Sequence, residues 1–156
     1  MTTCSFTKKS QIFVGIDASP TTHYRATAHN TTGNTKMKNY LITIFNSPEA
    51  EKTWENLTPE QMQASMAKYM AYSERLRNEG RLLAGEGLSM NGHTIQGTGA
   101  DQHVTDGPHI LAKELVGGFY FITAENLNEA LAIARDCPGL AHGATVEVRE
   151  QMDYGQ

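Results

Sequence analysis

A carboxylate, an imidazole and an ammonium group recur at short spacing near residue 106 of this sequence. Asp106, His109 and Lys113 stand at positions i, i+3 and i+7, which places all three side chains on one face if the segment is helical. A histidine beside a carboxylate can act as general acid and base near neutral pH, so Asp106 and His109 are candidate catalytic residues. The alternative is structural: Asp106 caps the turn, Pro108 lies in its first turn, and Lys113 is a solvated helix end.

The same stretch offers a pattern of metal ligands. Its members are Asp101, His103, Asp106 and His109. Zinc and manganese accept such nitrogen and oxygen donors. However, residues 94–96 and 102–104 are expected to be the arms of a hairpin, where side chains alternate between two faces and would not converge. We therefore predict no metal and no cofactor.

Four residues are candidate ligand-binding groups: Tyr69, Arg75, Glu86 and Lys113. Tyr69 and Arg75 lie on a predicted helix, while two glycines flank Glu86 and suggest a carboxylate held beside a bulge or a cavity. The alternative for Glu86 is an ordinary carboxylate in a turn. Because the sequence has no catalytic triad order, phosphate loop or dinucleotide motif, it leaves open whether the protein is an enzyme.

Periodicity predicts the first elements that would position these groups. Residues 39–45 are apolar on both alternating faces, which is typical of a strand buried on both sides. Thr58, Pro59 and Gln61 form a capping box with proline at the first helical position, and a helix of about twenty residues should follow and end near Gly80. The predicted inward stripe of this helix is Met62, Met66, Tyr69, Ser73 and Leu76.

The second half of the chain is predicted to hold three strands, at 82–84, 119–123 and 145–149, with the hairpin between the first two. Asn126 should cap a second helix. The predicted inward residues of that helix are Leu127, Ala130, Leu131 and Ala134. The resulting order indicates an α+β fold: a ferredoxin-like βαββαβ sheet with an inserted β-hairpin and both helices on one face.

The predicted sheet is apolar on both sides. Phe119 and Phe121 alternate with Tyr120 and Ile122, yet the two helices cover the same face. The uncovered face needs a partner, and a symmetric dimer that stacks two sheets into an α/β barrel would provide one. We therefore predict a homodimer that forms through this sheet face.

Composition and charge indicate the class of protein and the partners that it can bind. The 156 residues suit one domain with a sizeable core, and 39% hydrophobic with 19% charged residues is ordinary for a soluble protein. Residues 1–36 carry four basic side chains against one acidic, a charge of +3, so the net charge of −4 leaves −7 on the rest. An acidic body argues against nucleic-acid binding.

Cysteine usage and hydropathy indicate where in the cell the protein is expected. Cys4 and Cys137 suit neither a disulfide framework nor a metal site, and the sequence has no apolar run of membrane-spanning length. We therefore expect a cytoplasmic protein without membrane contact. Residues 1–36 are expected to form a poorly ordered N-terminal extension and residues 37–156 the domain; the composition of the extension is also that of an organelle transit peptide.

Residues 106–114 read DGPHILAKE, and Gly117 and Gly118 precede an aromatic residue. This stretch resembles the DGPFAETKE signature of the YCII-related (DGPF) domain family, in which two glycines and Phe or Tyr follow. The resemblance runs from Met37 to about Asp153 and implies a dimeric α+β barrel. A translation start at Met37 would explain where the resemblance begins.

Two departures from the resembled family concern the candidate site. His109 stands where the family usually carries Phe. Relatives also carry a His and an Asp on the first helix, and the corresponding positions here are Tyr69 and Asn78. The resemblance therefore implies a pocket whose usual acid and base pair is missing.

Three functions fit these observations. The first is the binding or transformation of a small metabolite, anionic or carbonyl-bearing, in a pocket near the turn at residues 106–109. The second is a noncatalytic regulatory or binding module associated with sigma-factor signalling, because DGPF-type relatives are often associated with extracytoplasmic-function sigma factors. The third is a purely structural dimer.

Overall fold

The computed structural model describes residues 36–89, 91–107 and 114–155. Its main sheet is antiparallel, with the strand order β2-β5-β1-β6. The strands are β1 (Lys38–Asn46), β2 (Leu82–Gly87), β5 (Leu115–Ala124) and β6 (Thr145–Glu150). Helix α2 (Pro59–Asn78) joins β1 to β2, and α3 (Leu127–Arg135) joins β5 to β6. This is the α+β, ferredoxin-like arrangement that the sequence predicts.

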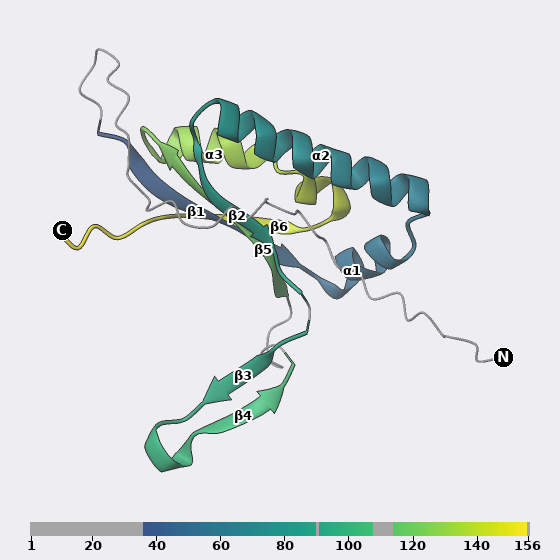
Figure 1. The fold of residues 1–156 in the computed structure, drawn as a ribbon, viewed down its shortest axis with the longest axis vertical. Coiled ribbons are helices and arrows are strands. Elements are labelled where there is room, and N and C mark those ends of the chain that lie inside the picture. The colour runs from purple at the N-terminus through teal and green to yellow at the C-terminus, as the bar shows by residue number, and fades with distance from the viewer. Residues whose placement is uncertain (1–35, 90, 108–113, 156) are drawn as a thin grey trace, which may run out of the picture.

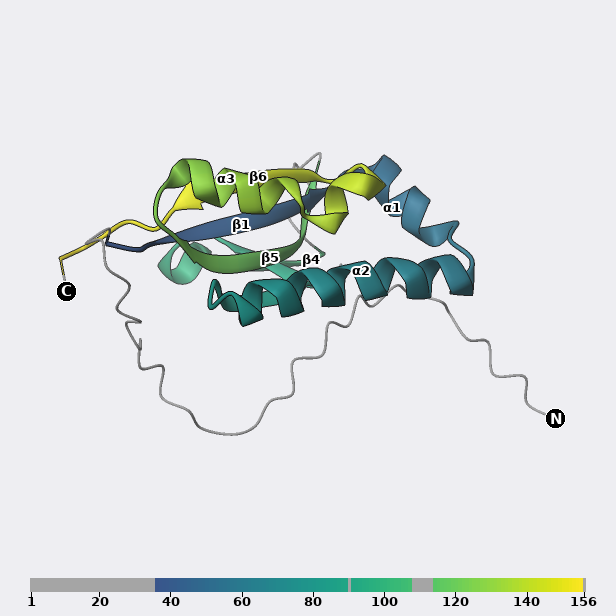
Figure 2. The same ribbon diagram turned by 90° about the horizontal axis from the view of Figure 1, so that it is seen from above.

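Both long helices cover one face of the main sheet. Figure 1 shows α2 and α3 on the same side of the strands, and Figure 2 shows α3 toward β6 and α2 toward β5. The core lies in this layer, and its fully buried large side chains come from β1, β5 and α2. They are Tyr40, Ile42, Ile122 and Leu76. The helix-facing side of the sheet is therefore the side on which a site can be enclosed.

Helix α2 begins and ends where the sequence predicts. The Thr58 side chain accepts a hydrogen bond from the Gln61 amide at 3.2 Å, and the Gln61 side chain accepts one from the Thr58 amide at 2.9 Å. Gly80, at φ 66°, follows the last turn. Tyr69, Ser73 and Leu76 of the predicted stripe are buried, together with Ser65 and Tyr72, while Met62 and Met66 are half-buried.

Helix α1 (Pro48–Glu55) is an element that the sequence patterns above do not predict. It begins with the same signals as α2: Ser47 Oγ accepts from the Ala50 amide at 3.2 Å, and Pro48 occupies the first position. The helix is only eight residues long, so it has too few turns to show a periodic apolar stripe. It buries Ala50 and Trp54.

The inward face of α3 is only partly as predicted. Ala130 and Ala134 are buried as expected, but Leu127 and Leu131 are exposed, and Ile133 is buried in their place. The two alanines and Ile133 form one stripe, and the leucines lie at its edge because successive residues turn by 100° around a helix. The prediction for Leu127 and Leu131 is therefore wrong. A short 3₁₀ turn, η2 (Pro138–His142), follows α3.

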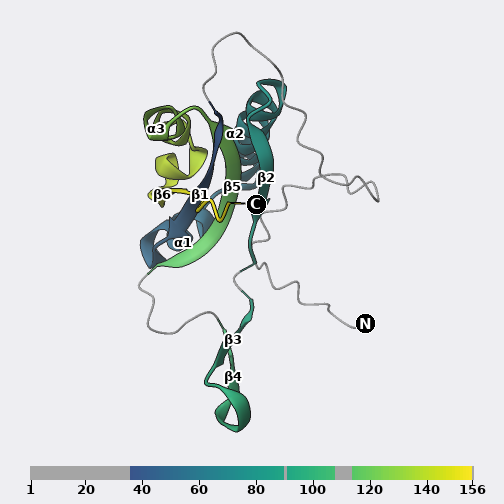
Figure 3. The same ribbon diagram turned by 90° about the vertical axis from the view of Figure 1, so that its left-hand side faces the viewer.

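The predicted hairpin is present and stands away from the main sheet. Strands β3 (His93–Gln96) and β4 (His103–Asp106) pair only with each other among the described strands, and Figures 1 and 3 show them projecting from the body. Ile95 and Val104 are paired across the hairpin and are 62% and 60% exposed. Predicted candidate Asp106 is the last residue of β4, and the turn that it is predicted to cap lies outside the described residues.

The face of the main sheet opposite the helices carries large apolar side chains that no described element covers. Strand pairing places Leu41 beside Phe121 and Phe45 beside Val116 on this outer face, with Phe119 between them. Leu41 and Val116 are exposed, and the three phenylalanines are half-buried. The sheet is thus apolar on both faces, as the sequence indicates.

The packing of α2 leads to a first prediction. Leu76 is 0% exposed, whereas Met70 on the same helix is 60% exposed. Leu76→Ala should lower the free energy of unfolding by about 2–5 kcal/mol, because it removes buried methyl groups and leaves a cavity. Met70→Ala should change it by less than about 0.5 kcal/mol. Denaturant unfolding of both variants measures the difference, and equal losses would contradict this description of the core.

Candidate functional site

Three glycines leave space under the helices at one end of the sheet. Gly85 pairs with Tyr120, Gly118 pairs with Ile44, and Gly87 pairs with Gly118. Paired residues on neighbouring strands share a face, so these glycines lie on the same side as the buried Tyr120 and Ile44. Because they have no side chains, the layer between sheet and helices is unfilled here. The resulting pocket has a volume of about 430 Å³, its open mouth included.

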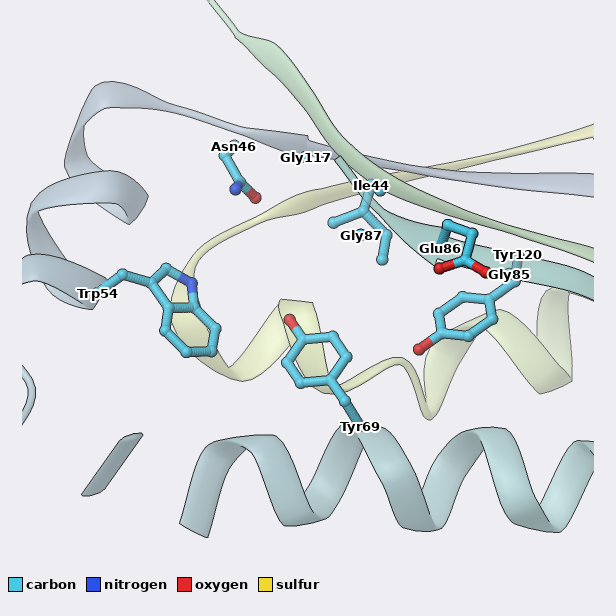
Figure 4. A pocket seen from close by; sticks show the side chains of 10 residues that line it. Ile44, Asn46, Trp54, Tyr69, Gly85, Glu86, Gly87, Gly117 and Tyr120 are labelled. Carbon is cyan, nitrogen blue, oxygen red and sulfur yellow. The ribbon is translucent and has the colours of Figure 1, made fainter. Parts of the chain in front are cut away.

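Side chains from the sheet, α1 and α2 surround this pocket. Figure 4 shows Ile44 and Tyr120 extending from the sheet toward α2, Tyr69 extending back toward the sheet, and Trp54 beside them. The full lining is Ile44, Asn46, Trp54, Tyr69, Gly85, Glu86, Gly87, Gly117, Gly118 and Tyr120.

Larger residues could not replace the glycines without moving these walls. A Cβ at Gly85 would lie 2.6 Å from Cδ1 of the Tyr120 ring, and a Cβ at Gly117 would lie 2.5 Å from Asn46 Nδ2. At Gly118 it would lie 2.9 Å from the carbonyl oxygen of Glu86. The glycines therefore allow Tyr120 and Asn46 to lie close against the strands.

The four buried tyrosines differ in what their hydroxyl groups contact. Three of the hydroxyls have hydrogen-bond partners in the protein. Tyr40 bonds Glu150 Oε2 at 3.4 Å, Tyr72 donates to the Ile133 carbonyl at 3.0 Å, and Tyr120 shares a bond of 3.5 Å with Ser73 Oγ. The Tyr69 hydroxyl has no partner among the described residues, although Tyr69 is only 6% exposed. Burial raises the pKa of Tyr69, so this group is a neutral hydrogen-bond donor.

Trp54 presents a second donor without a partner. Its side chain is 3% exposed, and its ring centroid lies 6.1 Å from that of Tyr69. No described residue accepts a hydrogen bond from its indole nitrogen, which lies on the side of the ring toward the sheet (Figure 4). Buried tryptophan N–H and tyrosine O–H groups usually have a partner. The pocket thus has two donors that the described protein leaves unused.

The side chain of His142, in η2, packs against the ring of Trp54. The two rings are 4.6 Å apart at an angle of 41°, and His142 Nε2 is buried without a hydrogen-bond partner among the described residues. Burial lowers the pKa of His142 below its ordinary value of 6.5, and the nearby Lys68 ammonium lowers it further. At neutral pH the imidazole is therefore uncharged and packs as an apolar ring.

Of the candidate ligand-binding groups, the structure brings Tyr69 and Glu86 to the pocket. Glu86 pairs with Phe119, so its side chain leaves the strand on the outer face, and its main chain borders the pocket. Arg75 lies outside the lining: it pairs with Asp136 at 2.9 Å, and its guanidinium is 5.4 Å from the Tyr72 ring centroid.

The candidates from residues 106–113 are not part of the described pocket lining. Asp106 Oδ1 lies 3.7 Å from His93 Nε2 on the hairpin, and the Asp106 side chain is 99% exposed. His109 and Lys113 lie outside the described residues. Within the described part of the chain, no group of three or more His, Cys, Asp or Glu is arranged to hold a metal ion. The helices described there include none that is long and apolar enough to cross a membrane.

Sequence reasoning missed four residues of this region: Asn46, Trp54, Tyr120 and His142. A signal was present for two of them. Ser47 and Pro48 mark a helix start, which would have placed Asn46 before the cap and Trp54 on the buried side of the helix. The alternation in residues 119–122 predicted opposite faces for Tyr120 and Phe121, but not which of the two faces the helices. His142 lies in a segment without periodicity, so its contact with Trp54 had no sequence signal.

Comparison with known proteins identifies a family for this chain. The family model described as YCII-related domain matches residues 38–152, which is more than half of the chain. No curated protein matches the sequence. The matched range contains all the described strands and helices and every residue of the pocket lining.

The half-buried imidazole of His142 leads to a prediction about pH. His142 binds its proton less readily in the folded chain than at its ordinary pKa of 6.5, so its contribution to stability is complete above that pH and is lost as the pH falls toward the lowered value. Relative to His142→Gln, the wild-type protein should therefore lose stability between pH 7 and pH 5. Denaturant midpoints at both pH values test this, and a pH-independent difference between the two proteins would contradict it.

Proposed function

The chain belongs to the YCII-related domain family, and we propose that it binds a small molecule in the pocket between its sheet and helices α1 and α2. The observation that supports this most directly is the Tyr69 hydroxyl, which lies at the pocket without a hydrogen-bond partner among the described residues. A ligand that accepts a hydrogen bond from this hydroxyl would give it a partner, and such a bond typically contributes about 0.5–1.5 kcal/mol.

Binding is a better match to the described lining than a chemical step. The acid and base that the sequence suggests, Asp106 and His109, are not among the described lining residues. The carboxylate of Glu86 leaves its strand on the other face, and the raised pKa of Tyr69 makes its phenol a poor base. This favours a binding role, whether for a metabolite carrier or for the regulatory module that the family resemblance implies.

Filling the pocket tests this proposal. Ile44→Phe would place a ring in the pocket from the sheet side, at a cost of about 1–3 kcal/mol in stability. Each protein is incubated with a cell extract and washed, and the retained compounds are identified by mass spectrometry. The wild-type protein should retain a compound that Ile44→Phe loses.

The matched control is Met70→Phe, which adds the same ring on the exposed surface of α2 and should retain the compound. Circular dichroism confirms that each variant is folded. Retention of the same compounds by Ile44→Phe, or of none by the wild-type protein, would contradict a binding role for the pocket.

We also propose that the protein is a homodimer that forms through the outer face of the sheet. This face carries Leu41, Phe45, Phe119, Phe121 and Val116 without cover from the described elements. Monomeric proteins rarely expose a contiguous apolar surface of this kind. A two-fold axis would bring the same residues of a second copy onto it, which produces a self-complementary contact.

A charge at the centre of this face should prevent the dimer. Phe121 is half-buried in the single chain and lies beside Leu41. Phe121→Asp would place an unpaired carboxylate in an apolar contact, so we expect monomer or aggregate. Met70→Asp adds the same charge on the far side of α2 and should remain dimeric. Light scattering distinguishes the two states, and an unchanged dimer in Phe121→Asp would rule out this face.

A further inference from the structure

The walls of the pocket define the chemistry of its ligand beyond the fact of binding. We propose that the ligand is an uncharged aromatic molecule carrying a carbonyl oxygen, which accepts hydrogen bonds from the Tyr69 hydroxyl and the Trp54 indole N–H. This inference rests on the proposed binding function. It specifies which class of compound can occupy the site and which groups hold it.

The first argument is the type of polar group that the pocket leaves unused. An indole N–H can only donate, and a neutral tyrosine hydroxyl beside it donates as well. The two donors are carried by rings whose centroids are 6.1 Å apart, on different helices. Asn46, by contrast, already donates from Nδ2 to Glu51 Oε1 at 2.8 Å. A ligand with an acceptor oxygen can pair with the indole N–H, which only donates, and with the tyrosine hydroxyl, and a carbonyl can accept both hydrogen bonds.

The second argument is the absence of a counter-charge in the described lining. It holds no lysine, arginine or histidine, and its one carboxylate, Glu86, leaves the strand on the outer face. Glu51 is engaged by Asn46, and Arg75 is paired with Asp136 away from the pocket. A charged ligand would be desolvated without an opposite charge, which is costly in a buried site. An uncharged ligand avoids this cost.

The third argument is shape. The rings of Trp54, Tyr69 and Tyr120 form the walls, and Gly85, Gly87 and Gly118 expose bare main chain at the floor. Aromatic rings stack or meet edge to face at centroid separations of about 4.5–7 Å, which a flat ligand can reach with such walls. A flat molecule can also lie against strands without Cβ atoms. The expected ligand is therefore a planar ring with the carbonyl at one end.

Three probes of the same shape and different charge test this class. Benzamide is neutral and carries a carbonyl, benzoate is an anion, and benzamidine is a cation at neutral pH. Trp54 is the only tryptophan in the chain, so its fluorescence reports directly on occupancy of the pocket. Benzamide should bind, and each charged probe should bind at least about tenfold more weakly.

A pair of variants tests the proposed hydrogen bond. Tyr69→Phe keeps the ring and removes the hydroxyl, so benzamide should bind about three- to tenfold more weakly. Tyr72→Phe removes a hydroxyl that bonds the Ile133 carbonyl outside the pocket, so benzamide affinity should stay unchanged even if stability falls.

The outcomes separate this inference from the proposed function. If benzoate or benzamidine binds as tightly as benzamide, the ligand class is wrong while the binding pocket stands. If none of the three changes Trp54 fluorescence, the ligand class is wrong; the binding function itself is contradicted only if the wild-type protein also retains no compound that Ile44→Phe loses. Unchanged benzamide affinity in Tyr69→Phe would overturn the role of the hydroxyl.

Discussion

The structure depends on one constraint. The strand ends that carry glycines must lie close to the aromatic rings that pack above them. Gly85 lies directly beneath the Tyr120 ring, and Gly118 lies against the carbonyl of Glu86 in the neighbouring strand. With side chains at these positions, β2 and β5 could not pair at their present separation beneath the rings. The same missing side chains leave the pocket unfilled. Strand pairing and cavity formation therefore have one cause.

The layer above these strands is unusual in using tyrosine as its main aromatic residue. A tyrosine buries a large apolar surface but carries a hydroxyl that needs a partner. Most of these hydroxyls find one in a glutamate, a main-chain carbonyl or a serine, so each ring is fixed in position as well as buried. The ring at the pocket is the exception. Its hydroxyl lies at the pocket without a hydrogen-bond partner among the described residues.

The fold could be predicted from sequence because its signals are local and strong. The capping box at Thr58 predicts the start of α2, and the alternation at Phe119–Ile122 in β5 predicts that both faces of the sheet are apolar. The candidate site could not be predicted in the same way. Its lining residues come from β1, α1, α2, β2 and β5, and no local sequence pattern predicts that these elements come together. Asp106 shows the consequence: it lies at the end of β4 on the hairpin and is not among the described lining residues of the pocket.

The hairpin formed by β3 and β4 is structurally independent of the core packing of the main sheet. Its main-chain hydrogen bonds are internal, and a bond from the Gly107 amide to the Gly92 carbonyl at 2.8 Å closes its base. The strands that flank the insertion, β2 and β5, pair with each other regardless of the hairpin's length. Substitutions and length changes there leave the core packing untouched. This segment is therefore free to diverge between related chains faster than the sheet that carries it.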